Sequence, residues 1–180
     1  MTSREDEPPL PPAPVTRAQL LDLLAGLKIA TQTFEHEAVF TVEESEAVER
    51  AVPGGHTKNL FLKDAKGALF LVVAEAHSSV DLKALSKRLG AGRFSFGKAE
   101  LLNEVLGVPP GSVTAFALVN DRARRMRVVV DERLMSYATI NCHPLENTAT
   151  TTIRSADLLR FVRALGYEPT ILDLDRTREG

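Results

Sequence analysis

The sequence has 180 residues, a length that suits one domain built around one hydrophobic core. Apolar residues make up 44% and charged residues 26%, and no apolar run reaches the ~18 residues that span a bilayer, so we expect a soluble, cytoplasmic protein without membrane contact. The formal net charge of -2 argues against a basic protein that coats DNA or RNA. Any contact with RNA must therefore be local or be assisted by another protein.

The two ends of the chain are predicted to lie outside the folded domain. Residues 1–14 hold half of the ten prolines and include a run of charged residues. Such a composition cannot bury enough apolar surface to order itself. We therefore predict a flexible, proline-rich tail over residues 1–14, a domain over residues 15–175 and a short C-terminal tail over residues 176–180.

Between these tails, apolar periodicity and start and stop signals predict alternating helices and strands. Helices are expected at residues 16–27, 41–52, 81–89, 99–106, 131–135 and 155–165. Strands are expected at residues 33–39, 59–63, 68–74, 114–119, 126–130, 148–153 and 170–174. Capping boxes that begin at Thr16 and Thr41 mark the first two helix starts, and Ser155 is predicted to cap the last helix. Strands that arrive in pairs with helices between them predict an α+β fold: a single compact domain with a mixed, mostly antiparallel sheet and surrounding helices.

The first stretch that could carry chemistry is the glycine-rich segment 54–59, just before an apolar strand. A turn with an ordinary surface lysine is one interpretation of it. In the other, Lys58 holds a single phosphate as a compact point charge, with Thr57 and Asn59 beside it. The spacing of a P-loop is absent, so a nucleotide-binding loop of that kind is excluded.

The second stretch is the loop at residues 107–115, rich in glycine and proline. Its simplest interpretation is a stiff connection between a helix and a strand. In the functional interpretation, Gly111 lets a ligand approach the backbone closely, and backbone N–H groups bind an ester carbonyl.

The third stretch, residues 141–152, is densely polar between apolar strands, which favours a ligand pocket with Asn141, His143 and Asn147 among its walls. A histidine before a proline can equally be a structural group. Cys142 and His143 are adjacent on an extended segment and point to opposite faces, so they are not expected to form a nucleophile–base pair. A single cysteine and four scattered histidines give no metal-ligand spacing, and we expect neither a metal nor another cofactor.

Taken in order, three motifs resemble the YbaK/prolyl-tRNA editing family of trans-acting aminoacyl-tRNA deacylases. They are residues 57–62 (TKNLFL), 107–114 (GVPPGSVT) and 143–150 (HPLENTAT). The last motif is more similar to the alanine-specific branch, often called ProX or ProXp-ala, than to the cysteine-specific YbaK branch.

This resemblance implies a fold like the editing insertion domain of bacterial prolyl-tRNA synthetases. It implies hydrolysis of the ester between alanine and the terminal adenosine of proline tRNA, without a metal or a covalent enzyme intermediate. Lys58 matches the family lysine near the terminal phosphate and is the expected catalytic residue, and His143 matches a positioning histidine. Gly111, Ser112, Val113, Thr114 and Ala115 match the family's pocket loop, except that Ala115 stands where the family has proline.

The expected mechanism combines the chemical interpretation of the three stretches with the resemblance to the editing family. Lys58 fixes the phosphate, loop N–H groups hold the ester carbonyl, and water attacks with help from the ribose 2′-hydroxyl of the substrate. The expected partner is the acceptor end of a mischarged tRNA, with prolyl-tRNA synthetase or an elongation factor as a possible protein partner. Two alternatives stay open: a related deacylase for Cys-tRNA or Ser-tRNA, and a catalytically silent binding module.

Overall fold

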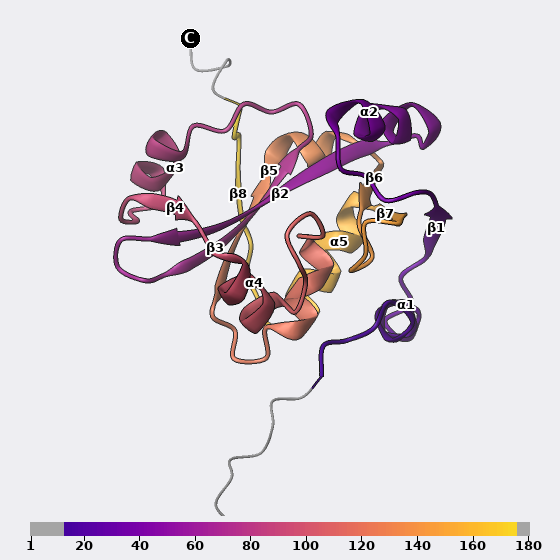
Figure 1. Cartoon of the computed structure of the whole chain (residues 1–180), viewed down its shortest axis with the longest axis horizontal. Helices are drawn as coiled ribbons and strands as arrows, with labels where there is room; N and C mark the ends of the chain where they lie inside the picture. Colours follow the sequence, from indigo (N-terminus) through magenta and orange to yellow (C-terminus); the bar gives the residue numbers. More distant parts are fainter. Residues whose placement is uncertain (1–12, 176–180) are drawn as a thin grey trace, which may run out of the picture.

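The computed structural model describes residues 13–175, which form one domain around a mixed sheet (Figure 1). The strand order is β1-β7-β6-β2-β3-β5-β8, and β4 pairs with β2. Four of the strand pairings are antiparallel and three are parallel. This confirms the predicted α+β fold. Most of the predicted tails, residues 1–12 and 176–180, lies outside the described residues.

The strands are β1 (Thr31–Glu35), β2 (Gly55–Asp64), β3 (Leu69–Glu75), β4 (Phe94–Phe96), β5 (Met126–Asp131), β6 (Thr139–Cys142), β7 (Ala149–Arg154) and β8 (Thr170–Leu172). The α-helices are α1 (Arg17–Gly26), α2 (Val42–Ala51), α3 (Leu82–Arg88), α4 (Ala99–Leu106) and α5 (Ser155–Ala164). Two 3-10 helices, η1 (Ala115–Asn120) and η2 (Glu132–Ser136), complete the described elements.

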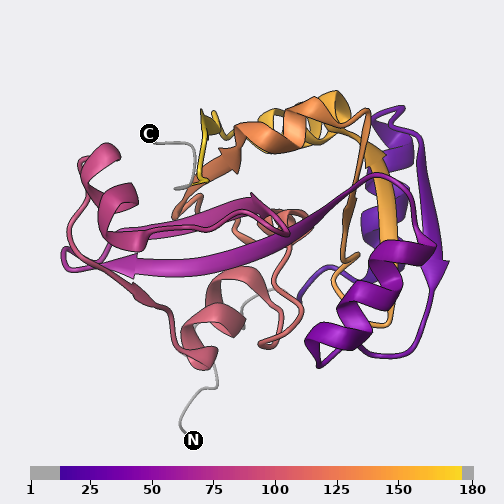
Figure 2. The same ribbon diagram turned by 90° about the horizontal axis from the view of Figure 1, so that it is seen from above.

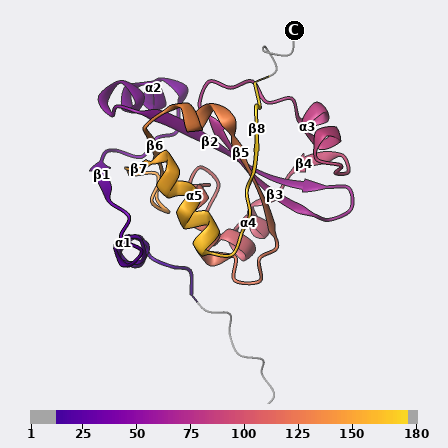
Figure 3. The same cartoon turned by 180° about the vertical axis from the view of Figure 1, so that it is seen from behind.

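The hairpin of β2 and β3 is central to the domain because both of its faces are covered. Alternate residues of β3 point to opposite sides, so Leu71 and Val73 join the core beneath α1, α4, α5 and η1, whereas Phe70 and Val72 join the smaller core beneath α3. Figure 2 shows α2 and α3 at opposite ends of this hairpin. Seen from behind, α5 runs obliquely between β7 and β8 (Figure 3).

The start of the domain is fixed by local bonds that the sequence predicts. The side chain of Thr16 accepts a hydrogen bond from the Gln19 backbone at 3.2 Å, and the Gln19 side chain accepts one from Thr16 N–H at 3.0 Å. Val15 N–H donates to Asn120 Oδ1 at 2.8 Å, which attaches the chain to η1 just before α1 begins.

Two predicted caps are corrected by the structure. Thr41 accepts from Glu44 N–H as expected, but the Glu44 carboxylate accepts from Phe40 N–H, so only half of the capping box forms. Ser155 does not cap α5: Arg154 occupies the N-cap position, and the Ser155 hydroxyl donates to the Tyr137 carbonyl at 2.8 Å.

The predicted strand at residues 114–119 is wrong, because this segment forms η1. Thr114 is extended and its hydroxyl accepts from Phe116 N–H at 3.3 Å, which begins the 3-10 helix. Residues 115–118 are all buried, so every position in this segment is apolar. A short continuous apolar run is also typical of a buried strand, and this is why the sequence suggested one. The strand predicted at residues 33–39 lies earlier, at β1, and the short strands β4 and β6 were not predicted.

Candidate functional site

A cleft of about 360 Å³ opens beside the start of β2, a volume within the range of small-ligand sites. It collects side chains from all three of the chemically suggestive stretches, together with a loop before α2. Its walls are Val39, Phe40, Thr41, Val42, Ser45, Thr57, Lys58, Asn59, Gly111, Val113 and His143.

The cleft lies where one edge of β2 lacks a neighbouring strand. On the edge away from β3, β6 pairs with Gly55 and His56, and β4 pairs with residues 62–64. Strand β6 ends at Cys142, and Pro144 has no N–H group with which to continue the ladder. The gap between β6 and β4 therefore leaves residues 57–60 open on that side.

Lys58 is half-buried, and its ammonium group donates a hydrogen bond to the Ser78 carbonyl. Ser78 is itself fixed, because its hydroxyl donates to Asp131 Oδ2 at 2.7 Å. Within the described part of the chain, no carboxylate pairs with Lys58. An ammonium group has three donors, so two remain for an anion at the cleft.

His143 has a fixed ring orientation and a lowered pKa. Its Nδ1 lies 3.1 Å from the Ala149 carbonyl, which can only accept, so Nδ1 carries the proton. Burial lowers the pKa of His143, and the positive charges of His36 and His56 lower it further, whereas the bond to Ala149 acts in the opposite direction. A neutral ring with its proton on Nδ1 presents Nε2 as an acceptor.

Cys142 is unsuited to nucleophilic attack. It is buried, and burial raises the pKa of its thiol to about 12, so the reactive thiolate is not formed at neutral pH. This agrees with the expectation that Cys142 and His143 do not work as a pair.

In the loop at residues 111–115, Gly111 and Val113 line the cleft, whereas Ser112, Thr114 and Ala115 are buried away from it. Gly111 has a φ of +88°, which suits glycine, and an added Cβ would meet nothing within 4 Å. Among the described residues, the N–H groups of Gly111 and Val113 have no acceptor. The loop therefore offers backbone donors at the cleft wall.

The position of Ala115 is compatible with either alanine or proline. It is the first residue of η1, a position at which a helix needs no N–H donor and at which proline is common. Here the hydroxyl of Thr114 caps the helix instead.

The predicted asparagines have different surroundings. Asn141 is fully engaged: its Nδ2 donates to the carbonyls of Pro53 and Gly55 at 3.1 Å each, and its Oδ1 accepts from Thr152. Asn147 lies outside the cleft wall and donates to the Val39 carbonyl at 3.4 Å, which holds the loop before α2. Asn59 is the exception, because its Oδ1 is buried without a hydrogen-bond partner among the described residues.

Thr57 stands between the cleft and a smaller pocket of about 40 Å³, and its hydroxyl donates to the Asn141 carbonyl at 2.8 Å. The smaller pocket has room for about three water-sized groups. It is lined by Val39, Ser45, Val48, Glu49, His56, Thr57, Asn141, Cys142, His143 and Thr150.

One wall of the cleft, made by α2 and the loop before it, lies outside all three of the stretches that the sequence singles out. Phe40 is 81% exposed and Val42 is 71% exposed, although both are large and apolar. Helix α2 contains no fully buried residue. Isolated exposed apolar residues beside a short acidic helix were the available signal, but a sequence alone does not show that such residues are exposed.

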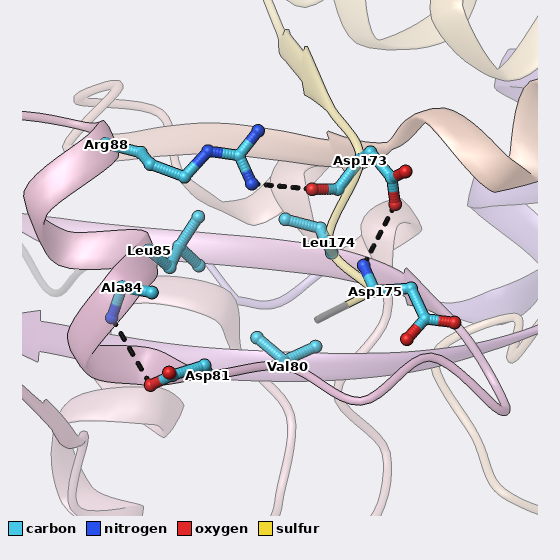
Figure 4. Close-up of a pocket in the computed structure, with 8 residues that line it drawn as sticks. All are labelled: Val80, Asp81, Ala84, Leu85, Arg88, Asp173, Leu174 and Asp175. Carbon is cyan, nitrogen blue, oxygen red and sulfur yellow. Dashed lines mark hydrogen bonds between the residues drawn. The ribbon is translucent and has the colours of Figure 1, made fainter. Parts of the chain in front are cut away.

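A separate hollow between α3 and residues 173–175 is structural (Figure 4). Its volume is about 20 Å³, enough for about one water molecule. Asp81 caps α3 through Lys83 N–H at 3.1 Å, and Arg88 donates to the Asp173 carbonyl at 2.6 Å. The bond from Arg88 attaches the segment after β8 to α3.

Two other kinds of functional feature are absent from the described residues. No helix of residues 13–175 has the length and apolar character needed to cross a membrane. No group of three or more histidine, cysteine, aspartate or glutamate side chains in that range could hold a metal ion.

Comparisons with known proteins agree on one family. The aminoacyl-tRNA editing domain matches residues 36–161. The prolyl-tRNA synthetase associated domain-containing protein 1 of Danio rerio is 42% identical over 166 residues, which are 91% of this chain and 90% of the relative. The prolyl-tRNA editing protein ProX of Acetoanaerobium sticklandii is 36% identical and covers 79% of this chain and 88% of its own.

Among solved structures, one described as a proposed trans-editing enzyme for prolyl-tRNA synthetase superimposes with a TM-score of 0.67 at 22% identity, over 89% of this chain and 95% of the other. This likeness supports the fold. The sequence matches show the family, and they agree with the three ordered motifs and with the cleft that gathers them. The chain therefore belongs to the aminoacyl-tRNA editing domain family, in its YbaK/ProX-like group.

Proposed function

We propose that this protein is a trans-editing deacylase that hydrolyses alanine from mischarged proline tRNA. The observation that carries the proposal is the convergence of Lys58, the backbone at Gly111 and Val113, and His143 on one cleft. These residues come from three distant stretches, and they supply a cation, neutral donors and a neutral acceptor. The similarity to an editing protein named for prolyl-tRNA supports the choice of tRNA.

In the proposed complex, Lys58 binds a phosphate of the terminal nucleotide with the two donors that Ser78 leaves unused. The N–H groups of Gly111 and Val113 face the ester carbonyl, where negative charge develops during attack. Donors that are fixed before the reaction stabilise that charge without reorganisation. Asn59, whose Oδ1 has no partner among the described residues, accepts a hydrogen bond from the bound nucleotide after rotation of its amide.

The proposed attack uses water and no enzyme nucleophile. The water oxygen bonds to the carbonyl carbon, the bond from that carbon to the ribose oxygen breaks, and the 2′-hydroxyl of the ribose relays the proton to the leaving oxygen. The neutral thiol of Cys142 agrees with this mechanism. His143 orients the aminoacyl group, and Asn141 and Asn147 hold the walls rather than the substrate.

Size supports alanine over proline. Binding energy distinguishes one or two methylenes by only ~1–3 kcal/mol, so a cognate prolyl group must be excluded by sterics. A pocket with room for about three water-sized groups accommodates the methyl and ammonium groups of alanine more readily than the four ring atoms that a pyrrolidine adds to the Cα. A protein partner, such as prolyl-tRNA synthetase or an elongation factor, remains a prediction.

The test is deacylation of a panel of charged tRNAs by the full chain. We expect release of alanine from proline tRNA and no turnover of the cognate prolyl ester. Equal turnover of both esters would contradict the size argument. Selective turnover of cysteinyl or seryl esters would indicate another substrate, and no turnover at all would indicate a binding module.

A further inference from the structure

Glu49 of α2 is the only acidic side chain in the wall of the 40 Å³ pocket. Its side chain is 21% exposed, and its Oε2 lies 2.8 Å from Nε2 of His77, which is 63% exposed. Within residues 13–175, no donor bonds to its other oxygen, Oε1. A largely buried carboxylate with one solvent-exposed partner keeps capacity for a further cation.

The rest of this pocket wall offers acceptors and contains no lysine or arginine. The ring of His143 presents Nε2 as an acceptor, because its Nδ1 proton is engaged by the Ala149 carbonyl. His56 is already engaged, since its Nε2–H donates to the Val52 carbonyl at 2.8 Å. The pocket is therefore suited to a small group that carries positive charge and donates hydrogen bonds.

An aminoacyl ester carries one such group. An α-amino group titrates near pH 8, so it is largely an ammonium ion at neutral pH. We infer that Glu49 binds the α-ammonium group of the aminoacyl ester, with Nε2 of His143 as a second acceptor. The inference rests on the proposed function, because it assigns a subsite to the same substrate.

This assignment gives Glu49 a role in specificity. With the ammonium held by Glu49 and the ester carbonyl held by the loop at Gly111 and Val113, the amino acid is fixed at two points. Its side chain then has one direction, into the remaining space of the small pocket. Esters without an α-amino group lack one of the two anchors and are expected to react slowly.

The experiment compares two esters of the same proline tRNA: the alanyl ester and the 2-hydroxypropanoyl ester, in which a hydroxyl replaces the ammonium group. Each kcat/KM is divided by the spontaneous hydrolysis rate of that ester, since the two differ in intrinsic reactivity. The variants are Glu49→Gln, which keeps shape and removes charge, and Glu46→Gln as a matched control on an exposed position of the same helix. His77→Ala removes the existing partner of Glu49.

The wild-type protein should prefer the alanyl ester by about ten- to a hundredfold, the effect of one charge-assisted hydrogen bond. Glu49→Gln should lose most of this preference by slowing the alanyl ester alone, whereas Glu46→Gln and His77→Ala should keep it. Thermal melting checks that each variant is folded.

Equal slowing of both esters in Glu49→Gln would assign Glu49 a structural role and overturn the inference. An equal rate on both esters in the wild-type protein would overturn it too, while leaving the proposed deacylase intact. If the wild-type protein hydrolyses neither ester, the proposed function fails and this inference fails with it.

Discussion

Replacement of Lys58 by alanine is expected to be more damaging to deacylation than to folding. The ammonium group makes one hydrogen bond within the described part of the chain, to the Ser78 carbonyl, and it lies at the cleft. Loss of a bond to a phosphate costs about 1.5–3 kcal/mol in transition-state binding, which slows the reaction about ten- to a hundredfold. Loss of the bond to Ser78, a fully buried residue, leaves a carbonyl group without its donor and costs about 1–3 kcal/mol of stability.

The assay is single-turnover deacylation beside thermal melting for the wild-type protein, Lys58→Ala and Lys58→Arg. A domain of this size loses about 2–4 °C in Tm per kcal/mol, so Lys58→Ala should lower the Tm by about 2–12 °C. Lys58→Arg should recover part of the rate, because a planar guanidinium does not reproduce a point charge in a confined site. Lys66→Ala, in the exposed turn after β2, is the matched control. A near-normal rate in Lys58→Ala would show that the phosphate does not bind here.

Four further outcomes are expected. Ala115→Pro should keep activity and raise stability by about 0.4–1 kcal/mol in denaturant melts, because the extended Thr114 (ψ 152°) suits a residue before proline; a lower Tm would mean that the buried ring does not fit. Cys142→Ser should keep its rate per folded molecule, and EDTA and thiol alkylation should have no effect; a loss of rate in a folded variant would restore a thiol mechanism. The pKa of His143 is lowered from 6.5 in the folded state, so protonation favours the unfolded chain, and the free energy of unfolding should fall as the pH drops below 6.5. His143→Gln should make the free energy of unfolding from urea melts less dependent on pH in this range; an unchanged dependence would refute the lowered pKa of His143. Deletion of residues 1–12 should leave melting and deacylation unchanged, because their composition lacks a core-forming pattern; aggregation of the shortened chain would contradict this.

Local chemistry made much of the fold predictable. The first helix follows from Thr16 and Gln19, whose side chains bond to each other's backbone within four residues of sequence. The hairpin of β2 and β3 follows from two apolar runs around a short polar turn. In both cases the residues that interact lie close together in the sequence, so the local sequence pattern is enough to predict the element.

The sequence patterns were insufficient where the conformation or the contacts of a segment depend on residues far away in the sequence. The apolar segment after Thr114 has a strand-like composition, but it forms η1 because it is buried on all sides, with Phe116 packed edge-on against Phe161 of α5. Likewise, the bonds of the Asn141 amide to Pro53 and Gly55 join residues more than 80 positions apart, so no local pattern predicts them. Its contact with substrate stays a prediction. The wall contributed by Glu49 depends on how α2 lies over β6, which no local pattern specifies.

The pairing of β1 with β7 has a consequence for how the domain assembles. Thr31 lies opposite Ile153, so this edge of the sheet closes a chain segment of more than a hundred residues. When such distant residues come together, the chain loses much conformational entropy before the energy of the new contacts compensates for it. Such contacts therefore slow folding. Because synthesis proceeds from the N-terminus, β1 must wait for β7 to leave the ribosome before it can pair. We therefore expect the cleft, which also needs His143, to form only after nearly the whole domain has been synthesised. A folded, active fragment that ends before β7 would contradict this order.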